Sequence, residues 1–185
     1  MASTSDLSHL GQPAAVRQAL SRGVGDGSLR RVARGLYAIP REDPALGSLS
    51  TSAEAVVEAL QRRDGIRLLP SGAHAANLLG LSDQVPMRMV FLTDGRARRI
   101  RVGKREIVLK RTTPRQMATA GRISSTVIQA LRWLGQEHID QAIVEKLQRR
   151  LSPRECRQLL DDARHAPAWV AAILDRIHAP KAKRA

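Results

Sequence analysis

Residues 16–41 read VRQALSRGVGDGSLRRVARGLYAIPR and predict a helix that leads directly into a tight hairpin. Apolar side chains recur at helical spacing over 13–24, with a proline in the first turn and two glycines near the end. Strands are expected at 29–33 and 36–39, joined by an Arg-Gly turn. This order of parts is that of a winged helix.

Polar side chains occupy one face of the expected helix and much of the hairpin. Arginine pairs with guanine and glutamine with adenine in the major groove, and hairpin arginines suit the phosphate backbone. We therefore expect base contacts from Arg17, Gln18 and Ser21, and phosphate contacts from Arg22, Arg30, Arg31 and Arg34. Leu36 and Ile39 are expected to face the core. The same pattern also fits an amphipathic helix and a polar hairpin on any soluble protein.

The net charge of the chain favours a polyanionic partner. Its 185 residues include 31 basic and 17 acidic ones, which gives a formal charge of +14, and 26 of the basic residues are arginine. Arginine stays charged and binds phosphate with two parallel hydrogen bonds. A genome rich in G and C would also raise the arginine content, so the placement of the charges carries the argument.

The cysteine content and the hydropathy pattern favour the cytoplasm and no membrane contact. A single cysteine, Cys156, excludes an internal disulfide and fits a reducing compartment. The first residues lack a basic region followed by an apolar run, and no apolar stretch approaches the ~18 residues that a membrane span requires.

The rest of the chain predicts a mixed α+β body. Residues 41–51 look like a linker, and 52–65 like a helix capped by Ser52. Strands are expected at 66–69 and 87–93, a helix at 71–81, a hairpin at 98–111, and helices at 123–134, 139–150, 153–164 and 168–178. The expected fold is therefore α+β, with a partial winged helix-turn-helix at 1–45, a body ending in a helical bundle at 46–180, and a basic tail at 181–185.

The hairpin expected at 98–111 carries a second concentration of positive charge. A Gly-Lys turn is expected at its tip. The basic residues of this second surface are Arg98, Arg99, Arg101, Lys104 and Arg105. They fit a second DNA contact, an RNA surface or a docking site for an acidic toxin. Exposed strands also use such charges to prevent edge pairing.

The sequence contains no recognisable catalytic or metal-binding motif. Asp161, Asp162 and His165 share one expected helix, where capping and pairing with arginines of the same helix account for them. Cys156 is expected on a buried helix face, without a partner base. We expect no enzyme activity, no cofactor and no metal.

Ser71 and Asn77 belong to a distinctive uncharged cluster, SGAHAAN. Ser71 is expected to cap a helix, and Asn77 to bond to the backbone at the far end of that helix. A role of this cluster beyond packing is left open.

The chain resembles the AbiEi-type antitoxins from about residue 6 to residue 178. The stretch at 16–41 is similar to the winged-helix ending of that group. Two further stretches resemble the DUF6088 branch of that group: LLPSGAHAANLLGLSDQVPMRMVFLTDGRARRIRVGKREIVLKR at 68–111 and SSTVIQALRWLG at 124–135. The resemblance implies an antitoxin that binds double-stranded DNA at its own operator, represses its own operon and counters a neighbouring nucleotidyltransferase-like toxin. The expected second partner is that toxin or the toxin's nucleic-acid target.

The resemblance also implies a further helix before the recognition helix, where this chain offers only MASTSDLSHLG. Without that helix, the apolar back of the recognition helix is expected to be exposed. Two other functions stay open, an RNA-binding or ribosome-associated module and an antitoxin that acts through protein contact alone. The operator, the oligomeric state and the way in which the toxin is neutralised also stay open.

Overall fold

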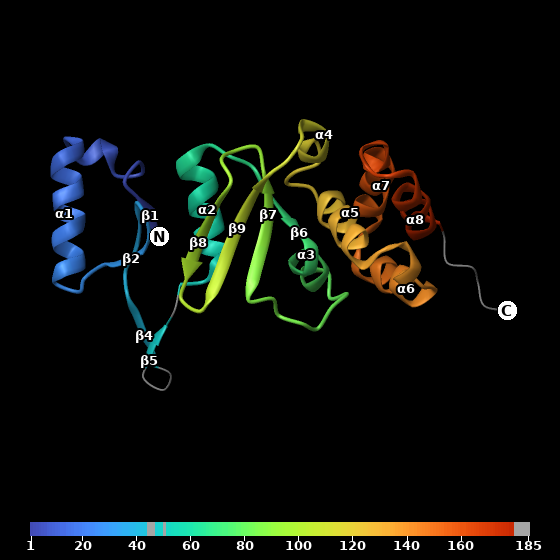
Figure 1. Ribbon diagram of the computed structural model, residues 1–185, viewed down its shortest axis with the longest axis horizontal. Helices are drawn as coiled ribbons and strands as arrows, with labels where there is room; N and C mark the ends of the chain where they lie inside the picture. Colours follow the sequence, from blue (N-terminus) through green and yellow to red (C-terminus); the bar gives the residue numbers. More distant parts are fainter. Residues whose placement is uncertain (44–46, 50, 180–185) are drawn as a thin grey trace. The chain divides into compact units, whose positions relative to one another are not determined.

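The structure, a computed structural model, describes residues 1–43, 47–49 and 51–179 (Figure 1). Helices and strands both contribute to it, which confirms the α+β class. The chain forms two compact units: unit 1 contains Met1–Ile66 and Arg98–Ile107, and unit 2 contains Arg67–Ala97 and the chain from Val108 onward. In the described ranges, no helix combines the length and the apolar character needed to cross a membrane.

Unit 1 is built on a three-stranded antiparallel sheet. Its elements are β1 (Ala2–Ser3), η1 (Ser8–Leu10), α1 (Pro13–Gly25), β2 (Arg30–Ala33), β3 (Leu36–Ala38), β4 (Arg41–Asp43), β5 (Gly47–Leu49), α2 (Ala53–Asp64), β8 (Arg98–Val102) and the start of β9 (Arg105–Arg111). The strand order is β1-β3-β2, with Tyr37 opposite both Ala2 and Arg31. The predicted helix and hairpin are confirmed. Strand β1 is an addition, because two residues are too few to show a periodicity.

The compact units divide the chain differently from the parts expected at 1–45 and 46–180. Helix α2 and strand β8 fall in unit 1, where α2 contacts β1 and β8 contacts β2. These contacts join residues far apart in the sequence, which local patterns do not reveal. A separate folding domain at 1–45 stays a prediction.

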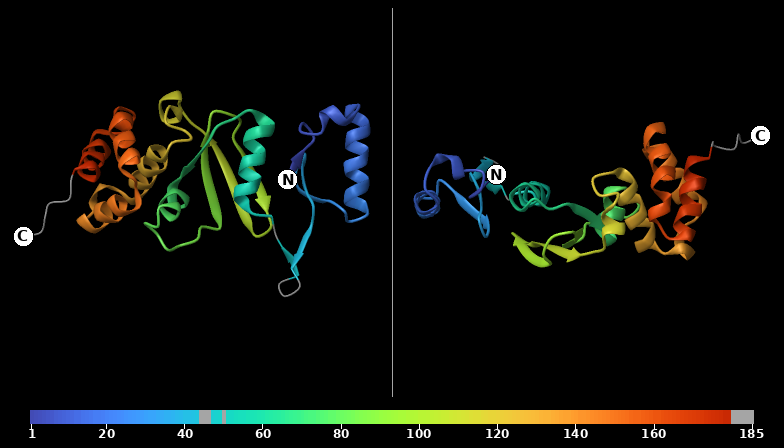
Figure 2. Two further views of the ribbon diagram at one scale, coloured as in Figure 1. Left: turned by 180° about the vertical axis from the view of Figure 1, so that it is seen from behind. Right: turned by 90° about the horizontal axis from the view of Figure 1, so that it is seen from above.

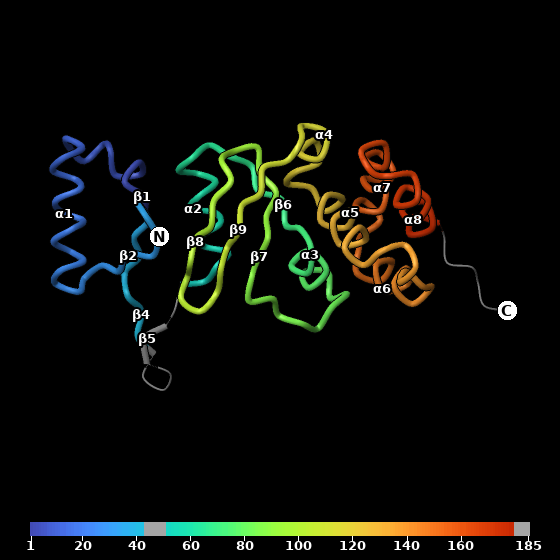
Figure 3. Tube along the Cα trace, in the orientation of Figure 1, coloured from blue at the N-terminus to red at the C-terminus, as the bar shows by residue number. Residues whose placement is uncertain are grey.

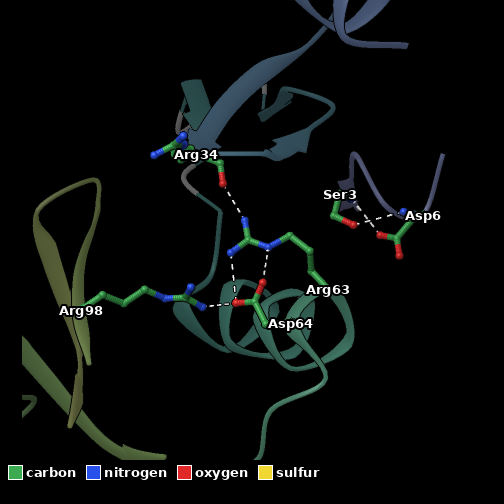
Figure 4. Close-up of polar contacts among 6 residues, drawn as sticks. All are labelled: Ser3, Asp6, Arg34, Arg63, Asp64 and Arg98. Carbon is green, nitrogen blue, oxygen red and sulfur yellow. Dashed lines mark hydrogen bonds and ion pairs between the residues drawn. The ribbon is translucent and has the colours of Figure 1, made fainter. Parts of the chain in front are cut away.

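Strand β1 leads into η1 through a reciprocal pair of hydrogen bonds. The backbone N–H of Ser3 donates to Asp6 Oδ2 at 2.8 Å, and the backbone N–H of Asp6 donates to Ser3 Oγ at 3.2 Å (Figure 4). These bonds fix the turn that brings the chain toward α1.

Helix α1 continues through both of its C-terminal glycines. A Cβ at Gly23 would lie 2.9 Å from Leu29 Cδ1, and the Leu29 N–H donates to the Gly23 carbonyl oxygen at 2.6 Å. A larger residue at position 23 would therefore require the Leu29 side chain to shift where the chain folds back against the helix on its way to β2. The apolar back of α1 is exposed only in part: Val24 is 37% exposed, whereas Leu20 is 5% exposed.

The hairpin β2–β3 packs one of its two predicted core residues. Leu36 is fully buried, as predicted. The prediction that Ile39 faces the core is wrong, because its side chain is 75% exposed. The side chains of a strand alternate between faces, so Leu36 shares its face with Ala38 and not with Ile39, which follows the end of the strand.

The stretch expected to be a linker contains a short hairpin. Strand β4 pairs with β5 in antiparallel fashion, with Arg41 opposite Leu49. Residues 44–46 and 50 lie outside the described ranges. Helix α2 then begins as predicted, with Ser52 Oγ accepting from the Ala55 N–H at 3.1 Å, and ends at Gly65, whose φ is +61°.

Unit 2 combines part of a second sheet with the C-terminal helices (Figure 2). Its elements are β6 (Leu68–Ser71), α3 (Gly72–Leu78), β7 (Arg88–Thr93), the end of β9, α4 (Pro114–Met117), α5 (Ile123–Leu134), η2 (Gln136–His138), α6 (Gln141–Arg150), α7 (Pro153–Asp162), η3 (Ala163–His165) and α8 (Ala168–His178). The strand order of this sheet is β6-β7-β9-β8. Strand β9, which follows β8 along the Cα trace (Figure 3), therefore starts in unit 1 and ends in unit 2.

The core of unit 2 is aliphatic and joins the helical bundle to α3. Leu131, Leu147, Leu159 and Leu174 are fully buried in one cluster, which α3 enters through Ala75 and neighbouring residues. Helices α5 and α8 begin and end at the predicted residues. The hairpin turn expected between β8 and β9 is also confirmed, with Gly103 at φ +58°.

Local capping predictions hold in two of three places in unit 2. Ser152 and Glu155 form a capping box at the start of α7, and Asn77 Nδ2 donates to the Ser82 carbonyl oxygen at 3.1 Å. Ser71 stands at the predicted N-cap position of α3, but its side chain makes no capping hydrogen bond. Its hydroxyl donates instead to Gln129 Oε1 of α5 at 3.3 Å.

The contacts of Asp162 differ from those expected for the group Asp161, Asp162 and His165. The Asp162 side chain is fully buried, accepts from the Ser124 hydroxyl, and pairs with Arg122 Nη1 at 2.7 Å. The expected pairing with arginines of its own helix is wrong for this residue, because the partners come from the start of α5. Cys156 is half-buried on the same helix, and burial, aided by the Glu155 charge, raises the pKa of its thiol. The predicted tail at 181–185 lies outside the described ranges.

Candidate nucleic-acid interface

Helix α1 presents the four residues predicted for it on its surface. Arg17, Gln18, Ser21 and Arg22 are all exposed. Arg17 lies four positions before Ser21, and Gln18 lies four positions before Arg22, so each pair shares a face of the helix. The buried residues of α1 are Leu20 and Gly23, on the side that meets the rest of unit 1. The polar face is therefore accessible along more than one helical turn.

The hairpin arginines differ in how accessible they are. Arg31 and Arg34 are exposed, whereas Arg30 is half-buried and donates from Nη2 to Thr51 Oγ1 at 3.0 Å. Arg30 therefore also holds the segment that precedes α2. Of the three predicted phosphate contacts, Arg31 and Arg34 are the better placed.

The turn of the hairpin is fixed by helix α2. Gly35 takes φ +70°, a conformation that favours glycine, and this leaves the Arg34 carbonyl oxygen available to α2. Arg63 Nη1 donates to that oxygen at 2.5 Å, while the Arg34 side chain points away from Arg63 (Figure 4). The bond anchors the backbone of the turn and leaves the Arg34 guanidinium outside.

Asp64 links α2 to strand β8. Its carboxylate accepts from Arg63 Nε at 2.7 Å and from Arg98 Nη2 (Figure 4). The Asp64 side chain is 22% exposed. Burial alone would raise its pKa, but the hydrogen bonds from Arg63 and Arg98 outweigh burial and hold the pKa below its ordinary value. Asp64 is therefore charged at neutral pH and orders two of the arginines around it.

The pKa of Asp64 predicts an acid-sensitive contribution to stability. Because its pKa is lower in the folded protein than in the unfolded chain, the stabilisation is complete above the ordinary value of 3.8 and is lost as the pH falls through the folded value. We expect Asp64→Asn to lower the free energy of unfolding by about 1 kcal/mol at pH 6 and to flatten its fall between pH 4.5 and pH 3. Denaturant unfolding over this pH range, with the exposed Asp161→Asn as control, tests the prediction. A pH profile unchanged from wild type would contradict it.

Five arginines meet around one pocket in unit 1. The pocket has a volume of about 690 Å³, and its lining includes Gly35 and Ile100. Its arginines are Arg34, Arg63, Arg98, Arg99 and Arg101, and we refer to it as the arginine pocket. The hairpin turn and strand β8, which the sequence suggests as two separate surfaces, thus line the same concavity. Lys104 and Arg105 are exposed at the tip of the β8–β9 hairpin, outside this lining.

Two residues of this site, Arg63 and Asp64, are absent from the sequence-based prediction. They end an ordinary amphipathic helix, where an Arg-Asp pair is a common solvated sequence. Their importance comes from contacts with residues about thirty positions away in each direction, at Arg34 and Arg98. A local signal for these contacts does not exist in the sequence.

A helix with an exposed Arg/Gln face, followed by an arginine-bearing hairpin and a basic pocket, defines a surface suited to nucleic acid. The chain belongs to the family described as "Family of unknown function (DUF6088)", whose family model matches residues 3–159. Among curated proteins, none matches the chain.

Proposed function

We propose that the protein is a DNA-binding antitoxin that represses transcription of its own operon. The observation that carries DNA binding is the exposed Arg17, Gln18, Ser21 and Arg22 face of α1, followed directly by a hairpin with Arg31 and Arg34 exposed. Strand β1 supports a winged-helix interpretation, since it precedes α1 and pairs with the second strand of the hairpin.

The geometry suggests a division of tasks between the helix and the hairpin. An α-helix fits the major groove, where Arg17 and Gln18 would read base edges with paired hydrogen bonds. Arg31 and Arg34 would bind phosphates, which positions the helix without selecting a sequence. In this proposal α1 supplies specificity and the hairpin supplies affinity.

The antitoxin role rests on the resemblance of residues 16–41, 68–111 and 124–135 to AbiEi-type antitoxins. The proposed partners are therefore the protein's own operator and a nucleotidyltransferase-like toxin, and the proposed compartment is the cytoplasm. A reading frame for such a toxin is expected next to the gene. Its expression should arrest growth, and co-expression of this protein should restore growth; arrest that persists would contradict the antitoxin role.

A mobility-shift titration tests DNA binding. The full chain is titrated onto its own upstream DNA, a scrambled duplex and a structured RNA, at salt concentrations from about 50 to 200 mM. We expect tighter binding to the upstream DNA than to the other two, with an affinity that falls steeply with salt. Preference for the RNA would overturn the proposal in favour of an RNA-binding module, and no binding at any salt would favour protein contact alone.

Arg17→Ala/Gln18→Ala isolates the contribution of base reading. Each bidentate contact discriminates by about 1–3 kcal/mol, so we expect the preference for upstream over scrambled DNA to fall by tenfold or more. Arg132→Ala/Gln136→Ala makes the same changes at exposed positions of unit 2 and should leave the preference intact. An equal loss in both variants would contradict recognition by α1.

A further inference from the structure

We infer that the arginine pocket binds two linked phosphate groups, as in pyrophosphate or in consecutive phosphates of a nucleic-acid backbone. The inference rests on the geometry of unit 1 and does not require the proposed repression. It concerns a concave site on α2, β8 and the hairpin turn, apart from the polar face of α1 on which the proposed base reading depends.

Positive charge exceeds negative charge in this pocket. Two carboxylates pair with its arginines: Asp64 binds Arg63 and Arg98, and Glu106 Oε1 lies 4.0 Å from Arg99 Nη1. Five arginines belong to the lining against these two carboxylates, so the residues around the concavity carry a formal excess of three positive charges. A bound polyanion would relieve the repulsion among the arginines.

Arg98 supplies a second, independent observation. Its Nε atom is buried and has no hydrogen-bond partner among the described residues, although its Nη2 is bonded to Asp64. A buried N–H without an acceptor is unfavourable, and such groups are rare in folded proteins. An anion oxygen bound in the pocket would supply the acceptor that this N–H lacks.

The size and lining of the pocket fit a phosphate ligand. Its volume of about 690 Å³ is typical of small-molecule sites. The planar guanidinium fork matches two phosphate oxygens at once, which makes arginine the preferred residue for this group. Pyrophosphate, with a charge of about −3 near neutral pH, balances the excess charge of the site.

Calorimetric titration of the full chain with pyrophosphate, without DNA, tests the inference. We expect saturable binding of one pyrophosphate per chain. Arg101→Gln removes the positive charge of an exposed lining residue and should weaken binding at least tenfold. Arg105→Gln makes the same change at the exposed hairpin tip and should stay within twofold of wild type. Binding that does not saturate, or an equal loss in both variants, would overturn the inference.

Asp64→Asn separates ligand binding from a merely structural role. The carboxylate competes with the ligand for Arg63 and Arg98, so its removal should strengthen pyrophosphate binding several-fold. Loss of binding in Asp64→Asn, with circular dichroism showing a folded protein, would overturn the inference as stated.

A competition experiment identifies the source of the phosphates. If pyrophosphate displaces upstream DNA and Arg101→Gln weakens both ligands, the pocket takes backbone phosphates. If pyrophosphate binds equally well to the DNA complex, the ligand is a free phosphate compound. Both results support the pocket, and failure of DNA binding would leave the DNA-free titration unaffected, so the two proposals fail separately.

Discussion

Replacing Asp162 by alanine is expected to lower the free energy of unfolding by about 1–4 kcal/mol. The carboxylate is fully buried, and its removal leaves the buried Ser124 hydroxyl without its acceptor. That loss costs about 1–3 kcal/mol. The lost pair with Arg122 adds about 1 kcal/mol or less, because the Arg122 side chain is 49% exposed and can return to water.

Denaturant unfolding of Asp162→Ala measures this effect against a neighbour on the same helix. Asp161 is exposed, so Asp161→Ala should change the free energy of unfolding by no more than about 0.5 kcal/mol. Asp162→Asn retains an oxygen acceptor and should lie between wild type and Asp162→Ala. Equal stability of Asp161→Ala and Asp162→Ala would show that the bonds from α5 do not hold α7 in place.

Arg31→Ala/Arg34→Ala is expected to weaken binding to every duplex alike. Each phosphate contact contributes about 0.9 to the slope of log affinity against log salt, so the slope should flatten by up to about 1.8. If the affinity at 1 M salt is unchanged, this corresponds to a loss of about 60-fold at 0.1 M. The alanine at position 34 keeps the backbone oxygen that Arg63 binds, so the hairpin turn keeps its anchor.

The matched control removes two exposed arginines from unit 2, as Arg132→Ala/Arg157→Ala. The net charge falls equally in the two double variants, which separates local contacts from the overall charge. Mobility shifts at several salt concentrations measure both slopes. If the control flattens the slope as much, the affinity comes from the charge of the whole chain and not from the hairpin.

Elements with local signals could be predicted from the sequence. Helix α7 has its capping box and α2 its Ser52 cap and Gly65 end, and all of these features lie within a few residues of the boundaries they set. Strand β1 and the partners of Asp162 depend instead on contacts across the fold. Periodicity carries no information on such contacts.

The candidate site also has one part that local sequence patterns predict and another that depends on contacts across the fold. The accessibility of Arg17, Gln18 and Arg31 follows from helical and strand spacing, so a sequence pattern can indicate it. The arginine pocket needs the hairpin turn, the end of α2 and strand β8 to meet, and Asp64 to organise the arginines between them. Arg30 differs from these residues. Its place in the hairpin predicts a phosphate contact, but its guanidinium donates a hydrogen bond to Thr51.

Unit 1 consists of two separate stretches of the chain, which limits the fragments that can retain the arginine pocket. A fragment that stops at Ile66 keeps α1 and the hairpin but omits Arg98, Arg99 and Arg101, and so loses most of the guanidinium groups of the arginine pocket. The chain passes through Arg67–Ala97 of unit 2 before strand β8 completes the lining of the arginine pocket. A gene fusion that transfers the pocket must therefore carry residues 1–107, including Arg67–Ala97 of unit 2, because both stretches of unit 1 must be inherited together.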